Sequence, residues 1–255
     1  MPSFASYPSL KDRTVFVSGG GSGIGASIVE HFAGQGAKVG FVDIDEPAST
    51  ALVKKIAAVG HVAPLFLKGD VRDVKAYQAA IAEVAAKLGT ITVLINNAAR
   101  DDRHDLADVT PAFWDERIAV NLRHQFFAIQ AVAPGMKAAG GGSIVNFSSV
   151  SYHTMTARLS VYEAAKAAVI GLTRGLARDL GPDKIRLNAI TPGWIMTQRQ
   201  IDLWLTPEAE ADLMKAQCLK EKVYPPDIAR MALFLASDDS RLISAQNFVV
   251  DGGRM

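Results

Sequence analysis

A glycine-rich turn between a strand and a helix constrains the fold of this chain more than any other feature. Residues 13–18 form a short apolar run typical of a buried strand, and the turn Gly19-Gly20-Gly21-Ser22-Gly23-Ile24-Gly25 follows at once. Apolar residues at helical spacing continue from Ile24 to Phe32. Glycines let the backbone approach a pyrophosphate closely, and a helix N-terminus favours phosphate groups. This order predicts the first unit of a dinucleotide-binding fold, while the turn alone is also compatible with a simple tight turn.

The alternation of strand and helix continues along the chain. Apolar runs predict further strands at 38–43, 64–68, 91–95, 143–147, 185–190 and 247–250, with helical patterns between them. Such alternation builds parallel sheets with helices on both faces. With 255 residues and neither an internal repeat nor a linker, the sequence predicts a single α/β domain over 1–255. We expect a Rossmann-type, doubly wound, seven-stranded parallel sheet.

Two segments need separate interpretation. Thr110 and Pro111 predict the start of a long helix, because threonine is a good N-cap and proline suits the first helical position. Asn121 lies on this helix among apolar neighbours. Three interpretations are open: it is a satisfied structural amide, it locally unwinds the helix, or it binds a water molecule. Residues 194–221 are polar and only partly helical. A segment of that length outside the alternation predicts a lid over the site.

Composition excludes several classes of function. The formal charge is +1 and no long run of one sign occurs, so neither nucleic acid nor an acidic surface is expected as a partner. A single cysteine excludes an internal disulfide and fits a reducing compartment. Met1–Leu10 lacks the pattern of a signal peptide, and no stretch is long and apolar enough for a membrane span. We expect a soluble cytoplasmic protein, and no metal, because no His/Cys/Asp cluster has ligand spacing.

Tyr162 and Lys166 lie four residues apart in a segment with a helical pattern, so their side chains share one face. A phenol with a pKa of about 10 is a poor base at neutral pH. A neighbouring ammonium favours the phenolate, and a shift of about three pKa units requires about 4 kcal/mol. Ser149 follows the strand predicted at 143–147, at the edge where open parallel sheets bind ligands. The three residues predict an acid/base site, although Tyr-x-x-x-Lys by itself is common.

Carboxylates at strand ends bear on the cofactor. Asp43 ends the second predicted strand, near where an acidic residue accepts hydrogen bonds from the adenosine ribose. A 2′-phosphate would meet like charge there, so NAD is favoured over NADP; the alternative is a plain turn residue or cap. Asp70 either contacts the adenine amino group or caps a helix, for which Asp73 is the stronger candidate. Asn96 and Asn97 end the fourth strand and need backbone or cofactor partners.

The chain resembles the short-chain dehydrogenase/reductases over essentially its full length. The residues that carry the resemblance, in the family's order and spacing, are the glycine turn 19–25, Asp70, Asn96-Asn97-Ala98, Asn121, Ser149, Tyr162, Lys166 and Pro192-Gly193. Ser18 replaces the usual threonine and Ala99 the usual glycine, and neither change removes a group needed for hydride transfer.

The resemblance implies roles for these residues. Tyr162 would be the acid/base, Lys166 would lower its pKa and bind the nicotinamide ribose, and Ser149 would orient the reacting oxygen. Asn121 would hold a water that relays protons to Lys166. NAD would be the cofactor, bound by Gly19, Ser22, Gly23, Ile24, Gly25, Asp43, Asp70, Val71, Asn97, Ala98, Tyr162, Lys166, Pro192, Gly193, Ile195 and Thr197. A homotetramer is the family's common state, and small residues on the outer face of the Tyr162 helix fit it: Ala164, Ala168, Gly171 and Gly175.

Several segments are similar to those of bacterial NAD-dependent sugar dehydrogenases of this family: 101–104, 114–117, 121–124, 217–220 and 233–239. This similarity implies oxidation of the anomeric hydroxyl of an aldose to an aldonolactone. The expected substrate-binding residues are Asn146, Ser149, Ser151, His153, Arg158, Tyr162, Trp194 and Gln198. His153 is equally interpretable as an exposed loop residue, and Trp194 as packing of the lid.

Alternative functions remain open at this point. One is oxidation or reduction at a non-anomeric carbon of a sugar acid or polyol. A 3-oxoacyl reductase would need an apolar channel and a basic docking patch, and neither is evident in the sequence. A non-catalytic NAD-binding regulator would not need the intact Ser149, Tyr162 and Lys166.

Overall fold

The computed structural model describes residues 4–255, which contain a seven-stranded sheet. The strands are all parallel and lie in the order β3-β2-β1-β4-β5-β6-β7, which confirms the predicted doubly wound sheet. Their bounds are β1 Thr14–Ser18, β2 Lys38–Asp43, β3 Leu65–Lys68, β4 Ile91–Asn96, β5 Gly142–Phe147, β6 Ile185–Pro192 and β7 Asn247–Val250.

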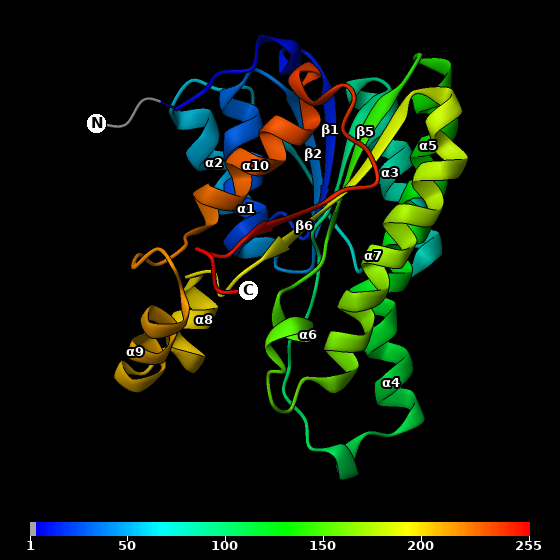
Figure 1. Ribbon diagram of the computed structural model, residues 1–255. Coiled ribbons are helices and arrows are strands. Elements are labelled where there is room, and N and C mark those ends of the chain that lie inside the picture. Colours follow the sequence, from blue (N-terminus) through cyan, green and yellow to red (C-terminus); the bar gives the residue numbers. More distant parts are fainter. Residues whose placement is uncertain (1–3) are drawn as a thin grey trace.

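Helices cover both faces of this sheet. In Figure 1, α1, α2 and α10 lie on one side of the strands, and α3, α5 and α7 lie on the other. The helices are α1 Gly23–Gly34, α2 Glu46–Ala58, α3 Val74–Leu88, α4 Pro111–Ile118, α5 His124–Ala138, α6 Ser151–Thr154, α7 Ser160–Leu180, α8 Gln198–Trp204, α9 Pro207–Ala216 and α10 Pro225–Ala236.

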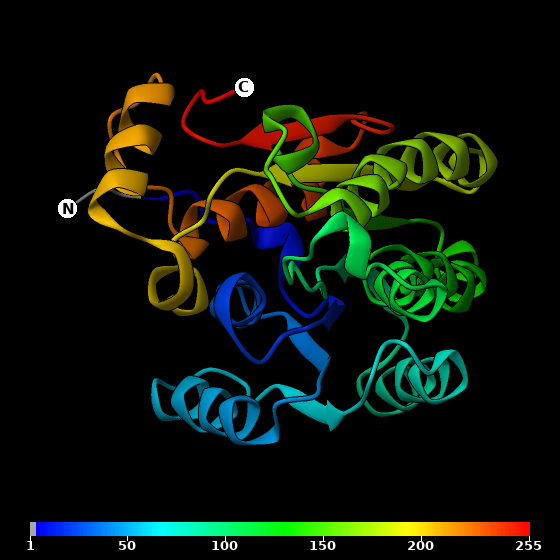
Figure 2. The same ribbon diagram turned by 90° about the horizontal axis from the view of Figure 1, so that it is seen from below.

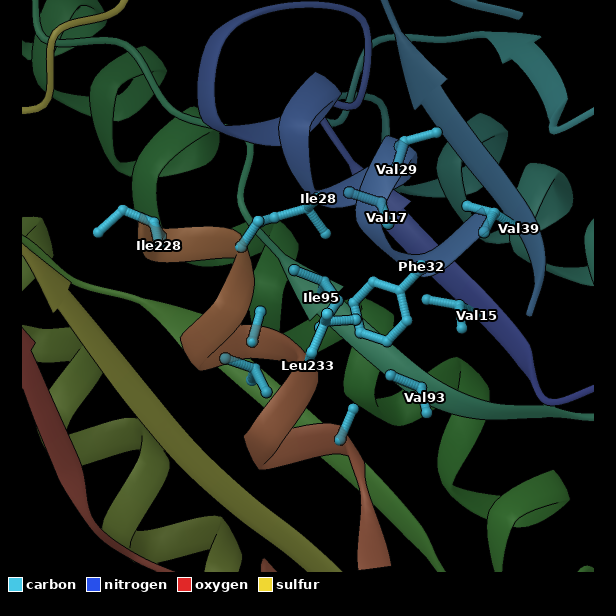
Figure 3. Close-up of a cluster of buried hydrophobic side chains, with 14 of the residues drawn as sticks. Val15, Val17, Ile28, Val29, Phe32, Val39, Val93, Ile95, Ile228 and Leu233 are labelled. Atoms are coloured by element: carbon cyan, nitrogen blue, oxygen red, sulfur yellow. The ribbon is translucent and has the colours of Figure 1, made fainter. Parts of the chain in front are cut away.

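The alternation of side chains along β1 divides the core into two layers. Val15 and Val17 point to the face of α1 and α10, where they join Phe32 and Leu233 in one buried cluster (Figure 3). Phe16 points to the opposite face and packs in a second cluster with residues of α3 and α5. Because both faces of a parallel sheet are covered, its strands are apolar throughout, which is why they were visible in the sequence.

The strand order reverses between β1 and β4, and ligands bind open α/β sheets at such a point. There the Asn97 amide side chain donates to the carbonyl of Gly19 over 2.9 Å. The Ser18 hydroxyl accepts from the backbone N–H groups of Asn97 and Ala98, both over 3.1 Å. The serine that departs from the family pattern therefore still ties the ends of the two strands together.

The long helix predicted from Pro111 is present but not regular. Thr110 caps α4 as expected, with its hydroxyl accepting from the backbone of Phe113 over 3.1 Å. A π-helical turn at Ala119–Arg123 then separates α4 from α5. The Asn121 side chain lies in this turn and donates to the carbonyls of Arg100 and Arg117, both over 3.0 Å. A side chain that takes up backbone carbonyls fits the local departure from α-helical geometry.

β6 extends two residues beyond its predicted end at 190. Thr191 and Pro192 still pair with Val249 and Val250 of β7. The Pro192 carbonyl accepts from the backbone of Val150 over 3.0 Å, so a residue without an N–H is accommodated at the strand end. The end predicted for this strand, at residue 190, was therefore two residues too early.

The segment predicted as a lid folds into α8 and α9. Figures 1 and 2 show both helices set apart from the sheet, on the side of α1 rather than of α7. A parallel bridge between Ile195 and Val223 closes the base of the segment. No helix in residues 4–255 is long and apolar enough to cross a membrane. The signal-peptide expectation falls partly on residues 1–3, which lie outside the described residues.

Candidate active site

A cavity of about 1100 Å³ opens at the carboxyl ends of the strands. It extends from the glycine turn past Tyr162 and Lys166 to α8 and α9. Drug-sized ligands occupy pockets of about 300–1,000 Å³, so this cavity has room for a dinucleotide and a small second ligand. All of the residues predicted to bind the cofactor line it.

The glycine turn is shaped for close approach of a ligand. Gly19 has a φ of +67°, and a Cβ on Gly25 would lie 1.8 Å from the Gly19 carbonyl oxygen, so neither position accepts a side chain. Ser22 is the N-cap residue of α1, and within residues 4–255 its side chain makes no capping hydrogen bond to the helix. The first N–H groups of α1 therefore face the cavity uncapped, which fits the phosphates of a dinucleotide.

Asp43 has the turn contacts of one of its two predicted roles, and its position leaves the cofactor role as a prediction. Its carboxylate accepts from the backbone N–H of Gly21 over 2.8 Å and of Asp45 over 2.9 Å, which is the turn role. It also lines the cavity, together with Asp45 and Asp70. Two hydrogen bonds leave lone pairs of this carboxylate for a ribose hydroxyl. Asp73, not Asp70, caps α3, as the sequence favoured.

Ser149, Tyr162 and Lys166 meet at the wall of the cavity. Lys166 is 1% exposed and donates from Nζ to the Phe147 carbonyl over 2.8 Å. Its Nζ lies 5.6 Å from the centre of the Tyr162 ring. The Ser149 hydroxyl accepts from the backbone N–H of Ser151 over 3.2 Å, which orients it at the start of α6.

Burial shifts both titrating groups of this trio toward their neutral forms. It lowers the pKa of Lys166 from 10.5 to about 7, and the Asp101 carboxylate only partly opposes this. Burial, and then Asp101, raise the pKa of Tyr162 above its ordinary value, while contact with Ser149 lowers it. The sequence suggested a lowered Tyr162 pKa; in this structure the loss of water around the phenol has the larger effect.

Asn121 lies behind the cavity wall. It is fully buried, and its oxygen accepts from the backbone N–H of Arg100 over 2.9 Å, so it joins the π-helical turn to the loop after β4. Beside it, His124 is fully buried and bonds through Nε2 to the carbonyl of Ala98 over 3.0 Å. Burial, and then the charge of Lys166, lower the pKa of His124 to about 3.

The residues predicted for the substrate divide into two groups. Ser149, Ser151, Tyr162, Trp194 and Gln198 line the cavity. The structure does not bring the other three, Asn146, His153 and Arg158, to the cavity wall.

Each of these three has another environment. Asn146 is fully buried and donates to the Thr173 hydroxyl over 3.0 Å, so it is a satisfied structural amide. His153 is exposed and packs on Tyr152, with ring centres 4.0 Å apart. Arg158 is exposed and pairs with Asp105 over 2.9 Å.

Several residues of the cavity wall were missed as site residues in the sequence. They are Asp101, Arg103, Thr154, Thr156, Arg199, Gln200 and Trp204. Asp101 had a usable signal, because it follows the polar end of β4 at the ligand-binding edge of the sheet. The residues of α8 had none, because their position depends on how α8 lies against the cavity.

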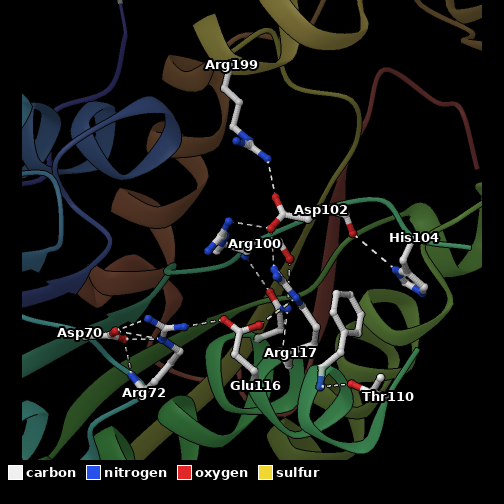
Figure 4. Close-up of polar contacts among 11 residues, drawn as sticks. Asp70, Arg72, Arg100, Asp102, His104, Thr110, Glu116, Arg117 and Arg199 are labelled. Atoms are coloured by element: carbon white, nitrogen blue, oxygen red, sulfur yellow. Dashed lines mark hydrogen bonds and ion pairs between the residues drawn. The ribbon is translucent and has the colours of Figure 1, made fainter. Parts of the chain in front are cut away.

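A chain of ion pairs runs from Asp70 at the cavity wall to Arg199 of α8 (Figure 4). Its carboxylates and guanidinium groups approach within 2.6–2.9 Å at each step, in the order Asp70, Arg72, Glu116, Arg117, Asp102 and Arg199. α8 is thereby attached to the loop after β4. Within residues 4–255, no group of three or more His, Cys, Asp or Glu side chains is placed to hold a metal ion.

The whole chain is similar to named dehydrogenases. A family model described as Enoyl-(Acyl carrier protein) reductase matches residues 19–254. The probable galactose dehydrogenase GalD of Rhizobium meliloti (strain 1021) is 53% identical, over 98% of this chain and 97% of that protein. D-xylose 1-dehydrogenase of Caulobacter vibrioides is 49% identical, over 98% and 99%. The solved structure of 7 alpha-hydroxysteroid dehydrogenase complexed with NADH and 7-oxo glycochenodeoxycholic acid has a TM-score of 0.91 at 31% identity and covers 96% of each chain.

Proposed function

The chain belongs to the short-chain dehydrogenase/reductase family and is an oxidoreductase, and from this membership we propose that it oxidises the anomeric hydroxyl of an aldose to an aldonolactone with NAD as hydride acceptor. One observation carries the chemistry: Ser149, Tyr162 and the buried ammonium of Lys166 share the wall of one cavity. The sugar is supported by the names of the two relatives, which share about half of this sequence over nearly its whole length.

In the proposed mechanism the reacting hydroxyl lies between Ser149 and Tyr162. The Ser149 hydroxyl, oriented by the Ser151 backbone, donates to the reacting oxygen as it gains carbonyl character. Tyr162 removes the hydroxyl proton, and Lys166 stabilises the phenolate and contacts the nicotinamide ribose. Bound NAD supplies the acceptor for the hydride from the same carbon. Asn121 holds the π-helical turn in place through its side chain. In this mechanism the turn positions a water that relays protons to Lys166.

We propose that NAD is preferred over NADP because of the negative charge at one end of the cavity. Asp43 and Asp45 both line the end of the cavity where a 2′-phosphate would lie, and like charges disfavour one another there. Arg72 also lines this region, but Asp70 and Glu116 already engage its guanidinium. A 2′-phosphate would therefore meet the carboxylates of Asp43 and Asp45, while Arg72 is already paired.

We also propose that residues 194–221 act as a lid and that the chain assembles as a homotetramer. Trp194, Arg199 and Asp212 come from this segment and line the cavity, so its displacement would open the site. The small residues predicted on the outer face of α7 are exposed: Ala164, Ala168, Gly171 and Gly175. Exposed Trp114 and Phe126 lie on the neighbouring α4 and α5. Such a surface is suited to close packing against a second copy.

The test is the initial rate of NADH formation at fixed NAD across aldoses, polyols and sugar acids. We expect turnover of one or two aldoses and acidification of weakly buffered solution as the lactone hydrolyses. Activity on polyols or sugar acids alone would move the reacting carbon away from C1. The Tyr162→Phe variant is the control for mechanism, because it removes the phenolic proton acceptor and little volume. Unchanged turnover in that variant would refute Tyr162 as the base.

A further inference from the structure

Asp101 is a carboxylate of the cavity wall, near Tyr162 in the lining, with unused hydrogen-bonding capacity. It accepts one short hydrogen bond, from Gln200 Nε2 over 2.7 Å. Its contacts with Arg199 are long, at 3.3 and 3.4 Å, whereas charge-assisted hydrogen bonds are usually about 2.7–2.9 Å. A carboxylate offers about four lone-pair sites. Asp101 therefore has acceptor sites left for a ligand in the cavity that it lines.

The neighbouring Asp102 differs in both respects. It accepts short contacts from Arg100, Arg117 and Arg199, at 2.8, 2.7 and 2.9 Å, which use most of its lone pairs. It is not among the residues of the cavity wall. The two adjacent carboxylates share Arg199 as a partner, but they differ in the number of short contacts that they accept and in their access to the cavity.

Gln200 fixes the position of the Asp101 side chain. Its amide oxygen accepts from the Trp194 indole Nε1 over 2.9 Å, while its amide nitrogen donates to Asp101. The three residues come from the loop after β4, the loop after β6 and α8, and all three line the cavity. A carboxylate whose position is fixed in this way loses little conformational entropy when it binds a ligand.

Asp101 also lies close to the reacting end of the cavity. It lines the same cavity as Tyr162 and Lys166, and its charge raises the pKa of both groups. On the same wall, the Ser151 hydroxyl is buried and has no hydrogen-bond partner among residues 4–255. A ligand hydroxyl would satisfy such a group. The neighbourhood of Tyr162 is therefore equipped for a ligand with more than one hydroxyl.

We propose that Asp101 is a specificity-determining residue that accepts a hydrogen bond from the substrate hydroxyl on the carbon next to the reacting carbon. The proposal rests on the proposed sugar oxidation and deepens it, because it selects vicinal diols over simple alcohols. A site built to bind a hydroxyl discriminates strongly against the analogue that lacks it, since its polar group is left unpaired.

The experiment compares two sugar pairs, D-galactose with 2-deoxy-D-galactose and D-xylose with 2-deoxy-D-xylose. Binding to the NADH complex is measured by titration calorimetry, which needs no turnover. In the wild type we expect the dissociation constant to rise by about 10- to 100-fold on removal of the 2-hydroxyl, as for a hydrogen bond to a charged group. Asp101→Asn should reduce this ratio to within about threefold of unity. Asp102→Asn should retain the wild-type ratio.

A pH profile separates recognition from a structural effect on the lid. Because the Asp101 charge raises the pKa of Tyr162, Asp101→Asn should shift the titration that governs kcat/KM to lower pH, and Asp102→Asn should not. The inference is overturned if the wild type binds each pair equally, if it binds neither sugar, if the ratio survives in Asp101→Asn, or if Asp102→Asn lowers it equally. Absence of NADH formation from any aldose would instead refute the proposed function, and the binding ratios would still decide this inference.

Discussion

Lys166 places its ammonium nitrogen 5.6 Å from the centre of the Tyr162 ring, one turn further along α7. Both side chains point into the same cavity wall, and the carbonyl of Phe147 holds the nitrogen there. Burial favours the neutral form of each group when it is considered alone. The Tyr162 phenolate and the Lys166 ammonium attract one another strongly at low dielectric, so each charged form is favoured when the other is present. The base strength of Tyr162 therefore depends on the charge of its neighbour.

Replacement of Lys166 by Met should lower kcat by at least about 100-fold at neutral pH, the scale of acid/base catalysis. The variant keeps an unbranched side chain of similar size without the charge, and it leaves Tyr162 with the raised pKa that burial imposes. Activity should then recover as the pH rises. Lys166→Arg keeps a cation and is the matched control, with a smaller loss. A pH–rate profile of Lys166→Met parallel to the wild type would contradict the charge coupling.

Asp43→Ser should reduce the preference for NAD over NADP, measured as the ratio of kcat/KM values, by about 10-fold or more. Removal of one carboxylate lowers the repulsion of a 2′-phosphate, and each tenfold change corresponds to about 1.4 kcal/mol. Asp45→Ser is the comparison, because Asp45 lines the same end of the cavity but caps α2. A wild type that prefers NADP would refute the assignment of NAD.

Acid should destabilise the fold through His124. Its pKa is about 3 in the folded chain against an ordinary value of 6.5. Between these values the unfolded chain binds a proton that the folded chain does not, so stability falls as the pH falls through this range. The slope is up to about 1.4 kcal/mol per pH unit for one proton. Above pH 6.5 the contribution is fully present.

Urea unfolding of the wild type and of His124→Gln at several pH values measures this effect. The variant lacks the titrating group and keeps a donor for the Ala98 carbonyl. We expect its stability to be lower at pH 7 but to change less between pH 6.5 and pH 5. Two curves with the same slope would assign the acid sensitivity to other groups.

The architecture was predictable because the signals that specify it are local. Each strand is an apolar run, and Gly19 and Gly25 mark the turn at the point where the strand order reverses. The predicted cofactor residues lie along that edge for the same reason. The π-helical turn at Ala119–Arg123 left only an indirect sign, a polar Asn121 among apolar neighbours.

The substrate end was less predictable because it depends on contacts between distant segments. Nearness to Ser149 in sequence suggested His153 and Arg158, but the loop turns away through Met155 and Arg158, which both have positive φ. Asp101 had a signal in its place after β4, but the sequence does not show that Gln200, far along the chain, fixes its side chain. No pattern within either segment shows that they meet.

Ala168→Glu should convert the proposed tetramer into smaller species without loss of the fold. Ala168 is exposed on the outer face of α7, and a Cβ at the nearby Gly171 or Gly175 would meet nothing within 4 Å in the single chain. A carboxylate buried without a partner at a subunit interface is costly. Light scattering after gel filtration measures the mass, and Ala51→Glu, at an exposed position of α2 on the other side of the sheet, tests whether the added charge alone is responsible. A monomeric wild type would refute the assembly.

Arg199 and Arg117 bind the same carboxylate of Asp102 but should contribute in different ways. The Arg199 side chain is 52% exposed, and the Arg117 side chain is 11% exposed. An exposed ion pair contributes about 0–1 kcal/mol, whereas loss of one partner of a buried pair costs about 3–5 kcal/mol. Arg117→Met should therefore lower the free energy of unfolding by several kcal/mol. Arg199→Met should leave it within about 1 kcal/mol of the wild type.

Of the two variants, Arg199→Met should have the larger effect on KM although it has the smaller effect on stability. Arg199→Met removes the ion pairs that join α8 to Asp101 and Asp102 and leaves only the Gln200–Asp101 hydrogen bond there. We expect the proposed lid to open more often and KM for the sugar to rise by about three- to tenfold, with a smaller change in kcat. Salt at 0.5 M should raise the wild-type KM in the same direction, because it screens the exposed pair, and should have little further effect on the variant. Urea unfolding and steady-state kinetics on both variants measure the two contributions. Equal losses of stability in the two variants, or an unchanged KM in Arg199→Met, would show that Asp102 does not hold the lid through Arg199.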